Sequence, residues 1–329
     1  MEKQSGNFFS VVGVIGCITS ILIILVLCAC MSIFVVLFAE SSNLAIKQAY
    51  KENVLSQGSS GDKVGLIKVE GIIWDMEDGV YEKGLTTYIL ESLDTILDDK
   101  DYKVLIIQID SPGGSLYDSA RITDKILELK ERGVVIVSYM ESIGASGGYW
   151  VAAPSDAIYL QPETFTGSIG IFVQTYDYEK LLDMIGIKEI YITNKEGTQK
   201  VPDDYDDPES QNYKIIQEIL DENYEEFISL IQDGRGLTRG QLEGLVDGRV
   251  ISGRQAVENG LADGFGGYDE ALSFGIEKAE LDDPKVIEFQ RSEILGFGSW
   301  TAKLNVLYTT LRPQEPKMSL VALPEKGNY

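Results

Sequence analysis

The stretch Met140-Glu-Ser-Ile-Gly-Ala-Ser-Gly-Gly-Tyr-Trp150 constrains the fold more than any other part of the sequence. Its small-residue run follows an apolar, strand-like segment, Val134–Tyr139, and precedes a short helix-like segment, Tyr149–Ala153. A serine between glycines at such a switch, here Ser146, is exposed at a helix N-terminus, where free N–H groups favour negative charge. This placement suits a nucleophilic serine, whose reaction builds an oxyanion. It also suits a tight turn in which the serine only caps the helix.

The composition limits the kind of partner. The chain has 329 residues, enough for one large domain or two ordinary ones. Lys and Arg number 28 against 52 Asp and Glu, which gives a formal net charge of −24. A chain this acidic is repelled by phosphate backbones. The sequence therefore predicts no nucleic-acid partner.

The sequence contains no histidine. This excludes a Ser-His-Asp triad, a Cys-His pair and a histidine zinc site. If a serine is the nucleophile, its base must be another group, and lysine is the usual substitute. All three cysteines, Cys17, Cys28 and Cys30, lie in the apolar N-terminal stretch, so disulfides and cysteine catalysis are absent from the rest of the chain.

The N-terminal region predicts a membrane anchor. Residues 8–39 are uncharged and mostly apolar, and this run of about 32 residues exceeds the roughly 20 that cross a bilayer core. It is also too long for the apolar core of a secretory signal peptide. We therefore expect residues 1–39 to form one transmembrane helix and residues 40–62 to form a polar linker. The flanking lysines do not specify the orientation of the span.

Helix-like and strand-like segments alternate over residues 63–283. Strands are expected at 64–69, 104–109, 134–139, 157–160, 171–173 and 189–193, and helices at 86–97, 115–132, 149–153, 208–232, 237–245, 253–259 and 269–279. This alternation predicts an α/β domain with a mostly parallel sheet and right-handed crossovers. The pattern weakens and prolines appear after about residue 284, so residues 284–329 are expected to form a partly ordered tail.

Three glycine-rich turns each follow an expected strand: Asp110-Ser-Pro-Gly-Gly114, Gly144-Ala-Ser-Gly-Gly148 and Thr166-Gly-Ser-Ile-Gly170. In a parallel sheet these turns gather at one edge, where ligands bind. The backbone N–H groups of Gly113 and Gly147 would then form an oxyanion hole. The alternative is that the Pro-Gly-Gly sequence is only a turn.

Taken in order, these motifs resemble the signal peptide peptidase A family, the protease IV-like serine peptidases of bacteria. The run Asp247-Gly-Arg-Val-Ile-Ser-Gly-Arg-Gln-Ala-Val-Glu-Asn-Gly-Leu-Ala-Asp263 is also similar to the family's segment there. The resemblance covers about residues 64 to 275. It implies a fold similar to Clp protease and crotonase, in which β-β-α units repeat around a mostly parallel sheet.

The resemblance implies a Ser–Lys dyad. Ser146 stands at the family's nucleophile position, and Gly197-Thr-Gln-Lys200 matches the run that carries its lysine, the general base. Ser168 matches a second family serine that orients the lysine. The sequence departs from the family at Val201, where an Asp is expected, and Lys195 lies close by. A lysine must be neutral to accept a proton from serine, so this mechanism requires a desolvated amine with a lowered pKa.

Short members of the family imply the remaining expectations. They carry one catalytic domain and an N-terminal anchor, with the domain outside the cytoplasm at the bacterial cell membrane. They form a homo-oligomeric ring in which the lysine comes from the same chain or from a neighbour. The implied substrates are apolar peptides, in particular signal peptides left in the membrane after preprotein processing, and no cofactor is needed.

Three other interpretations remain open at this point. A crotonase-type enzyme acting on coenzyme A thioesters would share the fold and the oxyanion hole. A non-catalytic membrane scaffold would share the fold alone. A peptidase acting on a specific membrane protein or a secreted peptide would share the mechanism but not the substrate. Trapping an acyl-enzyme on Ser146 separates a peptidase from the first two.

Overall fold

A computed structural model describes residues 26, 28–29, 31–32, 49–75, 83–192, 194 and 207–292. The internal contacts divide the chain into two units, Met1–Ala49 and Tyr50–Tyr329. The expected anchor lies almost entirely outside the described residues. Among the residues that the structure does describe, no helix is both long and apolar enough to cross a membrane.

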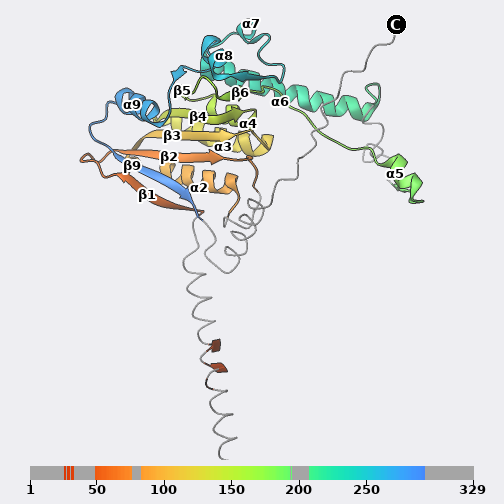
Figure 1. The fold of residues 1–329 in the computed structure, drawn as a ribbon, viewed down its shortest axis with the longest axis horizontal. Helices are drawn as coiled ribbons and strands as arrows, with labels where there is room; N and C mark the ends of the chain where they lie inside the picture. The colour runs from red at the N-terminus through yellow and green to blue at the C-terminus, as the bar shows by residue number, and fades with distance from the viewer. Residues whose placement is uncertain are drawn as a thin grey trace, which may run out of the picture. The chain divides into compact units, whose positions relative to one another are not determined.

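The second unit is built on one sheet with the strand order β1-β9-β2-β3-β4-β5-β8, and β6 joins β4 to β7 (Figure 1). Its strands are β1 (Tyr50–Ser56), β2 (Lys63–Glu70), β3 (Tyr102–Ser111), β4 (Val135–Ala145), β5 (Ala157–Leu160), β6 (Phe165–Gly167), β7 (Val250–Ser252), β8 (Gly264–Phe265) and β9 (Lys285–Arg291). Neighbours from β9 to β8 pair in parallel, whereas β1 at the margin and β7 pair antiparallel. The prediction of an α/β fold with a mostly parallel sheet is confirmed.

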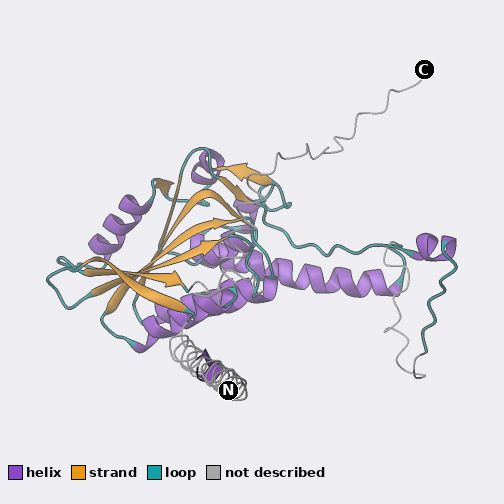
Figure 2. Cartoon of the chain, turned by 60° about the horizontal axis from the view of Figure 1, so that its bottom comes forward, coloured by secondary structure: helices purple, strands orange, loops and turns teal. Residues whose placement is uncertain are grey.

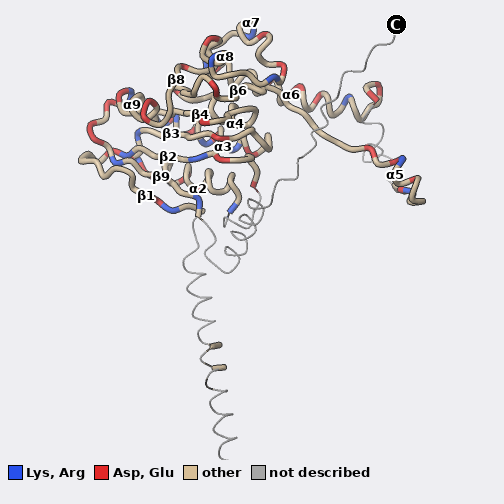
Figure 3. The backbone as a smooth tube through the Cα atoms, viewed as in Figure 1, with Lys and Arg blue, Asp and Glu red and all other residues tan. Residues whose placement is uncertain are grey.

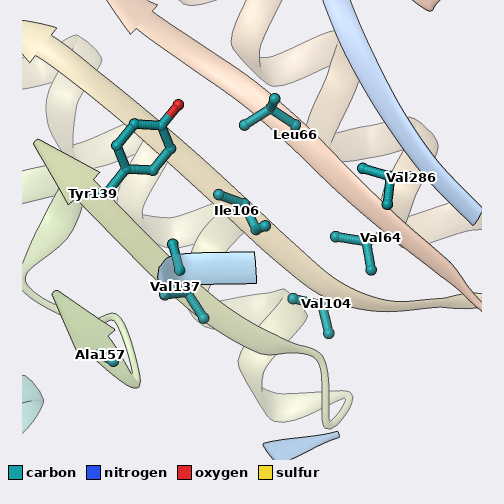
Figure 4. Close-up of a cluster of buried hydrophobic side chains, with 9 residues drawn as sticks. Val64, Leu66, Val104, Ile106, Val137, Tyr139, Ala157 and Val286 are labelled. Atoms are coloured by element: carbon teal, nitrogen blue, oxygen red, sulfur yellow. The ribbon is translucent and has the colours of Figure 1, made fainter. Parts of the chain in front are cut away.

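Helices cover both faces of the central strands because β3 is apolar on both sides. The apolar run Val104–Ile109 is fully buried. Helices α2 (Leu85–Asp98) and α3 (Leu116–Glu131) pack on one face, and α9 (Tyr268–Lys278) packs on the other (Figure 2). Figure 4 shows the cluster on the α9 side, where Ile106 lies between residues of the neighbouring strands.

Two strands at the sheet margin correct the predicted domain limits. The stretch predicted as a linker contains β1, and the stretch predicted as a tail begins with β9, which pairs with both β1 and β2. Both strands carry polar residues at positions that the sheet buries or half-buries, such as Glu288 and Asn53. These interruptions hide the period-2 apolar pattern that identifies a strand.

The chain between β6 and the long helix α6 (Gln211–Arg235) also differs from the prediction. Residues 171–173 and 189–192 are not strands, and a short helix, α5 (Glu179–Met184), lies between them. Their apolar sequence resembles that of strands, but within the described chain they pair with no strand of the sheet. The remaining helices are α4 (Gly147–Ala152), α7 (Arg239–Leu242) and α8 (Gly253–Glu258).

Candidate active site

Ser146 occupies a strained turn between β4 and α4. Its φ is 52° and its ψ is −119°, and its side chain makes no capping hydrogen bond to the helix. A non-glycine residue at positive φ costs about 1–3 kcal/mol and persists only where its surroundings hold it. Here the Ser146 N–H donates to Gly167 O at 2.9 Å, and its carbonyl accepts from Trp150 N at 2.9 Å. The interpretation of Ser146 as a simple helix cap is therefore wrong, because its side chain makes no capping hydrogen bond to the helix and Ser146 lines a cavity instead.

The helix behind Ser146 is a rigid support. All six residues of α4 are buried. The Tyr149 hydroxyl donates to Leu261 O at 2.7 Å, and the Trp150 ring packs against Phe227 of α6 with 4.5 Å between ring centroids. Contacts to Leu261 and to Phe227, which are distant in the sequence, thus hold the helix that follows the serine turn in place.

The turn after β3 lies directly against this serine. Gly113 has φ 101°, and a Cβ atom there would lie 2.7 Å from Gly147 N and 2.9 Å from Ser146 Cβ. Only glycine allows this approach. However, the Gly113 N–H already donates to Ser111 Oγ at 3.1 Å. Gly113 therefore brings the two turns together, and its N–H group is occupied.

In this turn the N–H group without an acceptor among the described residues belongs to Gly114 rather than to Gly113. A Cβ on Gly147 would lie 3.2 Å from Gly114 N and 2.5 Å from Ser119 Oγ, so the Gly114 and Gly147 N–H groups are neighbours. In the part of the chain that the structure describes, neither N–H group donates to an acceptor. Two unused N–H groups beside a serine hydroxyl are what an oxyanion hole requires.

Ser168 lies next to Ser146, because β4 and β6 pair in parallel with Ala145 opposite Gly167. Each serine follows one member of this residue pair. Ser168 also has positive φ, 50°, and its N–H donates to Arg249 O at 2.8 Å. Both serines line the same cavity. The structure thus brings the predicted serine pair together, although it does not test the role of Ser168.

A cavity of about 1000 Å³ opens above the two serines. Its walls come from the chain after β6, from α6 and from residues 246–248 before β7. The apolar or aromatic residues of the lining are Ile171, Phe172, Val173, Tyr213, Ile216, Leu220, Tyr224 and Val246. A cavity of this size and lining accommodates several apolar side chains of an extended peptide.

Two titratable side chains of this cavity, Asp247 and Tyr224, are already engaged by neighbouring groups. Hydrogen bonds from Arg249 lower the pKa of Asp247 to about 2, so this carboxylate is ionised and paired at neutral pH. Burial raises the pKa of Tyr224, whose hydroxyl donates to Val246 O at 2.7 Å. None of the described residues lining the cavity is a lysine or an arginine. The predicted base Lys200 and its neighbour Lys195 lie outside the described residues.

Comparison with known proteins identifies relatives. The profile of peptidase family S49 matches residues 128–282. A protein of Enterococcus faecium named signal peptide peptidase SppA is 33% identical over 252 residues, which are 75% of this chain and 72% of that protein. A protease of Synechocystis is 34% identical over 231 residues, 69% of this chain and 78% of that protein. Protease 4 of Salmonella typhi is 29% identical over 256 residues, 75% of this chain but only 41% of that longer protein.

Among solved structures, a ClpP1 variant from Listeria monocytogenes covers 63% of this chain and 94% of its own, with 14% identity and a TM-score of 0.42. The relatives and the strained serine lead to one class: the chain is a serine-type peptidase. It belongs to peptidase family S49, the family of signal peptide peptidase SppA and Protease 4. The resemblance drawn from the three glycine-rich turns is confirmed.

Sequence reasoning missed two parts of the site. It chose Gly113 as the donor, although the Pro-Gly-Gly sequence offers Gly114 as well. It also assigned no residue of the long helix to the site, whereas Ile216 and Leu220 of α6 line the cavity. In the structure α6 is 25 residues long and buries only four of them, so its other apolar positions are available to line a cavity.

Proposed function

We propose that the protein is a membrane-anchored serine endopeptidase that cleaves apolar peptides with a Ser146–Lys200 dyad. The Ser146 hydroxyl attacks the scissile carbonyl carbon while its proton passes to the neutral Lys200 amine. The resulting oxyanion accepts hydrogen bonds from the Gly114 and Gly147 N–H groups. The protonated lysine then gives its proton to the leaving amine, and water repeats the sequence on the acyl-enzyme. The observation that carries this proposal is the strained Ser146 beside two unused donors in an apolar cavity.

The apolar cavity supports a lysine base. An amine enclosed by side chains such as Ile171, Val173 and Leu220 is poorly solvated, which lowers its pKa and leaves it neutral at working pH. The Ser168 hydroxyl accepts or donates a hydrogen bond without adding charge, so it orients the neutral amine. Lys200 follows the chain segment that forms one cavity wall, and it serves its own chain or a neighbouring one.

The exposed apolar side chains after β6 support a homo-oligomeric ring. Over residues 171–192 the large exposed ones are Phe172, Val173, Tyr176, Tyr178, Leu181, Met184, Ile185, Ile187, Ile190, Tyr191 and Ile192. Exposed apolar surface on this scale marks an interaction site, and soluble assemblies are usually closed and symmetric. A ring of Clp protease/crotonase-like subunits built from β-β-α units covers this surface.

The substrates in this proposal are remnant signal peptides. The apolar cavity fits their apolar side chains, and the Enterococcus relative bears the name of a signal peptide peptidase. Residues 8–39 anchor the chain in the bacterial cell membrane by one span, and the catalytic domain lies outside the cytoplasm. A peptidase held in this way meets peptides that stay in the bilayer after processing.

The test is active-site labelling of the full chain. We would treat the protein in lipid nanodiscs with a fluorophosphonate and locate the adduct by mass spectrometry. The expected adduct lies on Ser146, disappears in Lys200→Ala and persists in the matched control Lys195→Ala. Equal labelling of Lys200→Ala would overturn the dyad. A folded, oligomeric wild type that stays unlabelled would overturn the peptidase mechanism and favour the scaffold.

A further inference from the structure

The chain enters the sheet at Tyr50, the first residue of β1. Tyr50 pairs with Arg291 at the end of β9, and β9 runs parallel to β2, β3 and β4. Tyr50 therefore lies at the carboxyl edge of the parallel strands. Ser146 lies at the same edge, beyond the end of β4. The two are separated by four strand spacings, about 19 Å at 4.8 Å per spacing.

The apolar segment is tethered to this edge. Between Ala39 and Tyr50 the chain has roughly ten residues, which reach at most about 36 Å when fully extended. The opposite edge of the sheet lies a further strand length away, because β1 runs antiparallel from Tyr50 to Ser56. If residues 8–39 are anchored in a bilayer, as proposed above, the edge that carries the catalytic serine is the one held close to it.

The same edge exposes an apolar patch beside the oxyanion turn. Its members are Ile72 and Trp74, which follow β2, and Tyr117 at the start of α3; they are 62%, 56% and 70% exposed. We name these three residues the edge patch. Ile73 between the first two is fully buried. The Arg121 guanidinium lies over the Tyr117 ring at 5.3 Å from its centroid, whereas Ile72 and Trp74 stay exposed beside the oxyanion turn.

The edge patch is held rigidly. Three backbone hydrogen bonds join the segment to the oxyanion turn: Gly71 N to Asp110 O at 3.0 Å, Ile73 N to Gly113 O at 2.9 Å, and Ser115 N to Ile73 O at 2.8 Å. The Asp75 carboxylate then accepts from the backbone N–H and the hydroxyl of Thr87 in α2, at 3.1 and 2.8 Å. Trp74 therefore lies between two residues, Ile73 and Asp75, that hydrogen bonds hold in place.

Cationic residues lie near the edge patch, together with the exposed carboxylates of Glu52 and Glu70. Asp75, which follows Trp74, packs against Gly84, which follows Lys83 in the chain. The Arg291 guanidinium donates to Lys83 O at 3.0 and 2.6 Å, which joins this corner to the end of β9 and the start of β1, where Lys51 is exposed. Figure 3 shows Lys or Arg positions near the start of α2 and at the margin that carries β1 and β9. Tryptophan and tyrosine flanked by lysine and arginine are typical of side chains at a membrane–water interface.

We propose that the carboxyl edge of the sheet docks on the phospholipid bilayer, with Trp74, Ile72 and Tyr117 at the headgroup level and Lys51 and Lys83 around them. This inference rests on the membrane anchoring proposed above. In this orientation the oxyanion turn and Ser146 face the bilayer surface. A peptide leaving the membrane reaches the cavity without crossing bulk water.

The test is tryptophan quenching by phosphatidylcholine brominated on its acyl chains, measured on the full chain in nanodiscs. Trp150 is buried and therefore shielded, and Trp300 is common to all samples. We expect the tryptophan fluorescence of the wild type to be quenched by the brominated lipid. Trp74→Phe should lose most of this quenching. The control adds Leu55→Trp to Trp74→Phe. Leu55 is exposed near the opposite end of β1, so its tryptophan should stay unquenched.

Three outcomes would overturn the docking, and they differ from one another. Equal quenching of the wild type and Trp74→Phe shows that Trp74 does not reach lipid. Unchanged quenching with a raised KM of Trp74→Phe for a water-soluble apolar peptide shows that the edge patch is a wall of the peptide site. Failure of the full chain to co-float with vesicles removes the anchor itself, and with it both the proposed membrane function and this docking.

Discussion

The sheet and the apolar segment after β6 are both rich in isoleucine and tyrosine, but they use these residues in opposite ways. In the sheet, Ile106 and Ile107 are buried between helices on both faces. In the segment, Ile192 is 93% exposed and Phe172 is 81% exposed. We call residues 170–192 together with the N-terminal half of α6 the arm.

The difference shows that the chain itself buries the apolar side chains of the sheet but not those of the arm. The sheet buries its own apolar surface and fixes the serine turn through α4 and the turn after β3. The arm supplies one wall of the cavity but leaves most of its apolar side chains in water. A change in the sheet should therefore appear as lost stability or distorted geometry, whereas a change in the arm should appear as lost assembly.

The largest expected effect is on the two glycine turns in the rigid region. Gly113→Ala places a methyl group 2.7 Å from Gly147 N, and no side chain can move to relieve it. We expect hydrolysis of a fluorogenic apolar peptide to fall by about 100- to 1000-fold, because displacing the Gly147 N–H group should cost as much as losing an oxyanion donor. The melting temperature of the variant serves as the control for folding.

Gly147→Ala provides the matched comparison for this effect. Its added methyl group would lie 2.5 Å from Ser119 Oγ, an atom that Ser119→Ala removes. The double variant should therefore recover part of the lost rate, whereas Ser119→Ala should recover nothing in Gly113→Ala. Equal loss in both double variants would contradict the close packing of the two turns.

A core truncation should affect stability rather than assembly. Ile106 is fully buried in the cluster on the α9 side of the sheet. Ile106→Ala should lower the free energy of unfolding by about 2–5 kcal/mol, because the cavity it leaves is enclosed on all sides. Denaturant unfolding measures this change, and light scattering should give the oligomer size of the wild type. A smaller oligomer would show that the sheet, too, contributes to assembly.

The opposite result is expected in the arm. Phe172→Asp combined with Ile192→Asp places two charges on the surface proposed to join subunits. Light scattering should then show smaller particles, and peptide hydrolysis should fall by about tenfold or more if a neighbour completes the site. The melting temperature of the domain should change little. Phe265→Asp, at an exposed position of β8 outside the arm, is the control and should leave the oligomer intact.

The sequence predicts the sheet better than the arm, for a physical reason. The run Val104–Ile109 is apolar except for Gln108 because both faces of β3 are buried in one chain, so local pattern and environment agree. Residues 171–173 and 189–192 carry the same apolar signal but are not strands. A local pattern reports that a side chain needs burial, and it does not report whether the partner belongs to the same chain.

The site shows the same division. Ser146 and Ser168 could be placed together from their motifs, because parallel strands bring successive turns to one edge. The choice between Gly113 and Gly114 as donor depends on which N–H group Ser111 Oγ occupies, and no sequence pattern contains that bond. The strands β1 and β9 were missed because polar residues interrupt their apolar pattern, and these polar residues have partners in the fold.

Glu288 gives the smallest predicted effect and tests whether this polar margin behaves as part of the sheet. Although burial acts to raise the pKa of Glu288, hydrogen bonds from Lys68 at 2.9 Å, Asn53 at 3.0 Å and Gln290 at 2.6 Å lower it. A carboxyl group with a lowered pKa stabilises the fold fully above its unfolded pKa, about 4.3, and loses that contribution as the pH falls through its folded value. Glu288→Gln should therefore cost about 1–2 kcal/mol at pH 7, reduced by the partial exposure of Lys68, and progressively less below about pH 4. Denaturant unfolding across this pH range measures the difference, with exposed Glu52→Gln as the control. A cost that is the same at pH 3 and pH 7 would mean that the side chain's shape, not its charge, holds β1, β9 and β2 together.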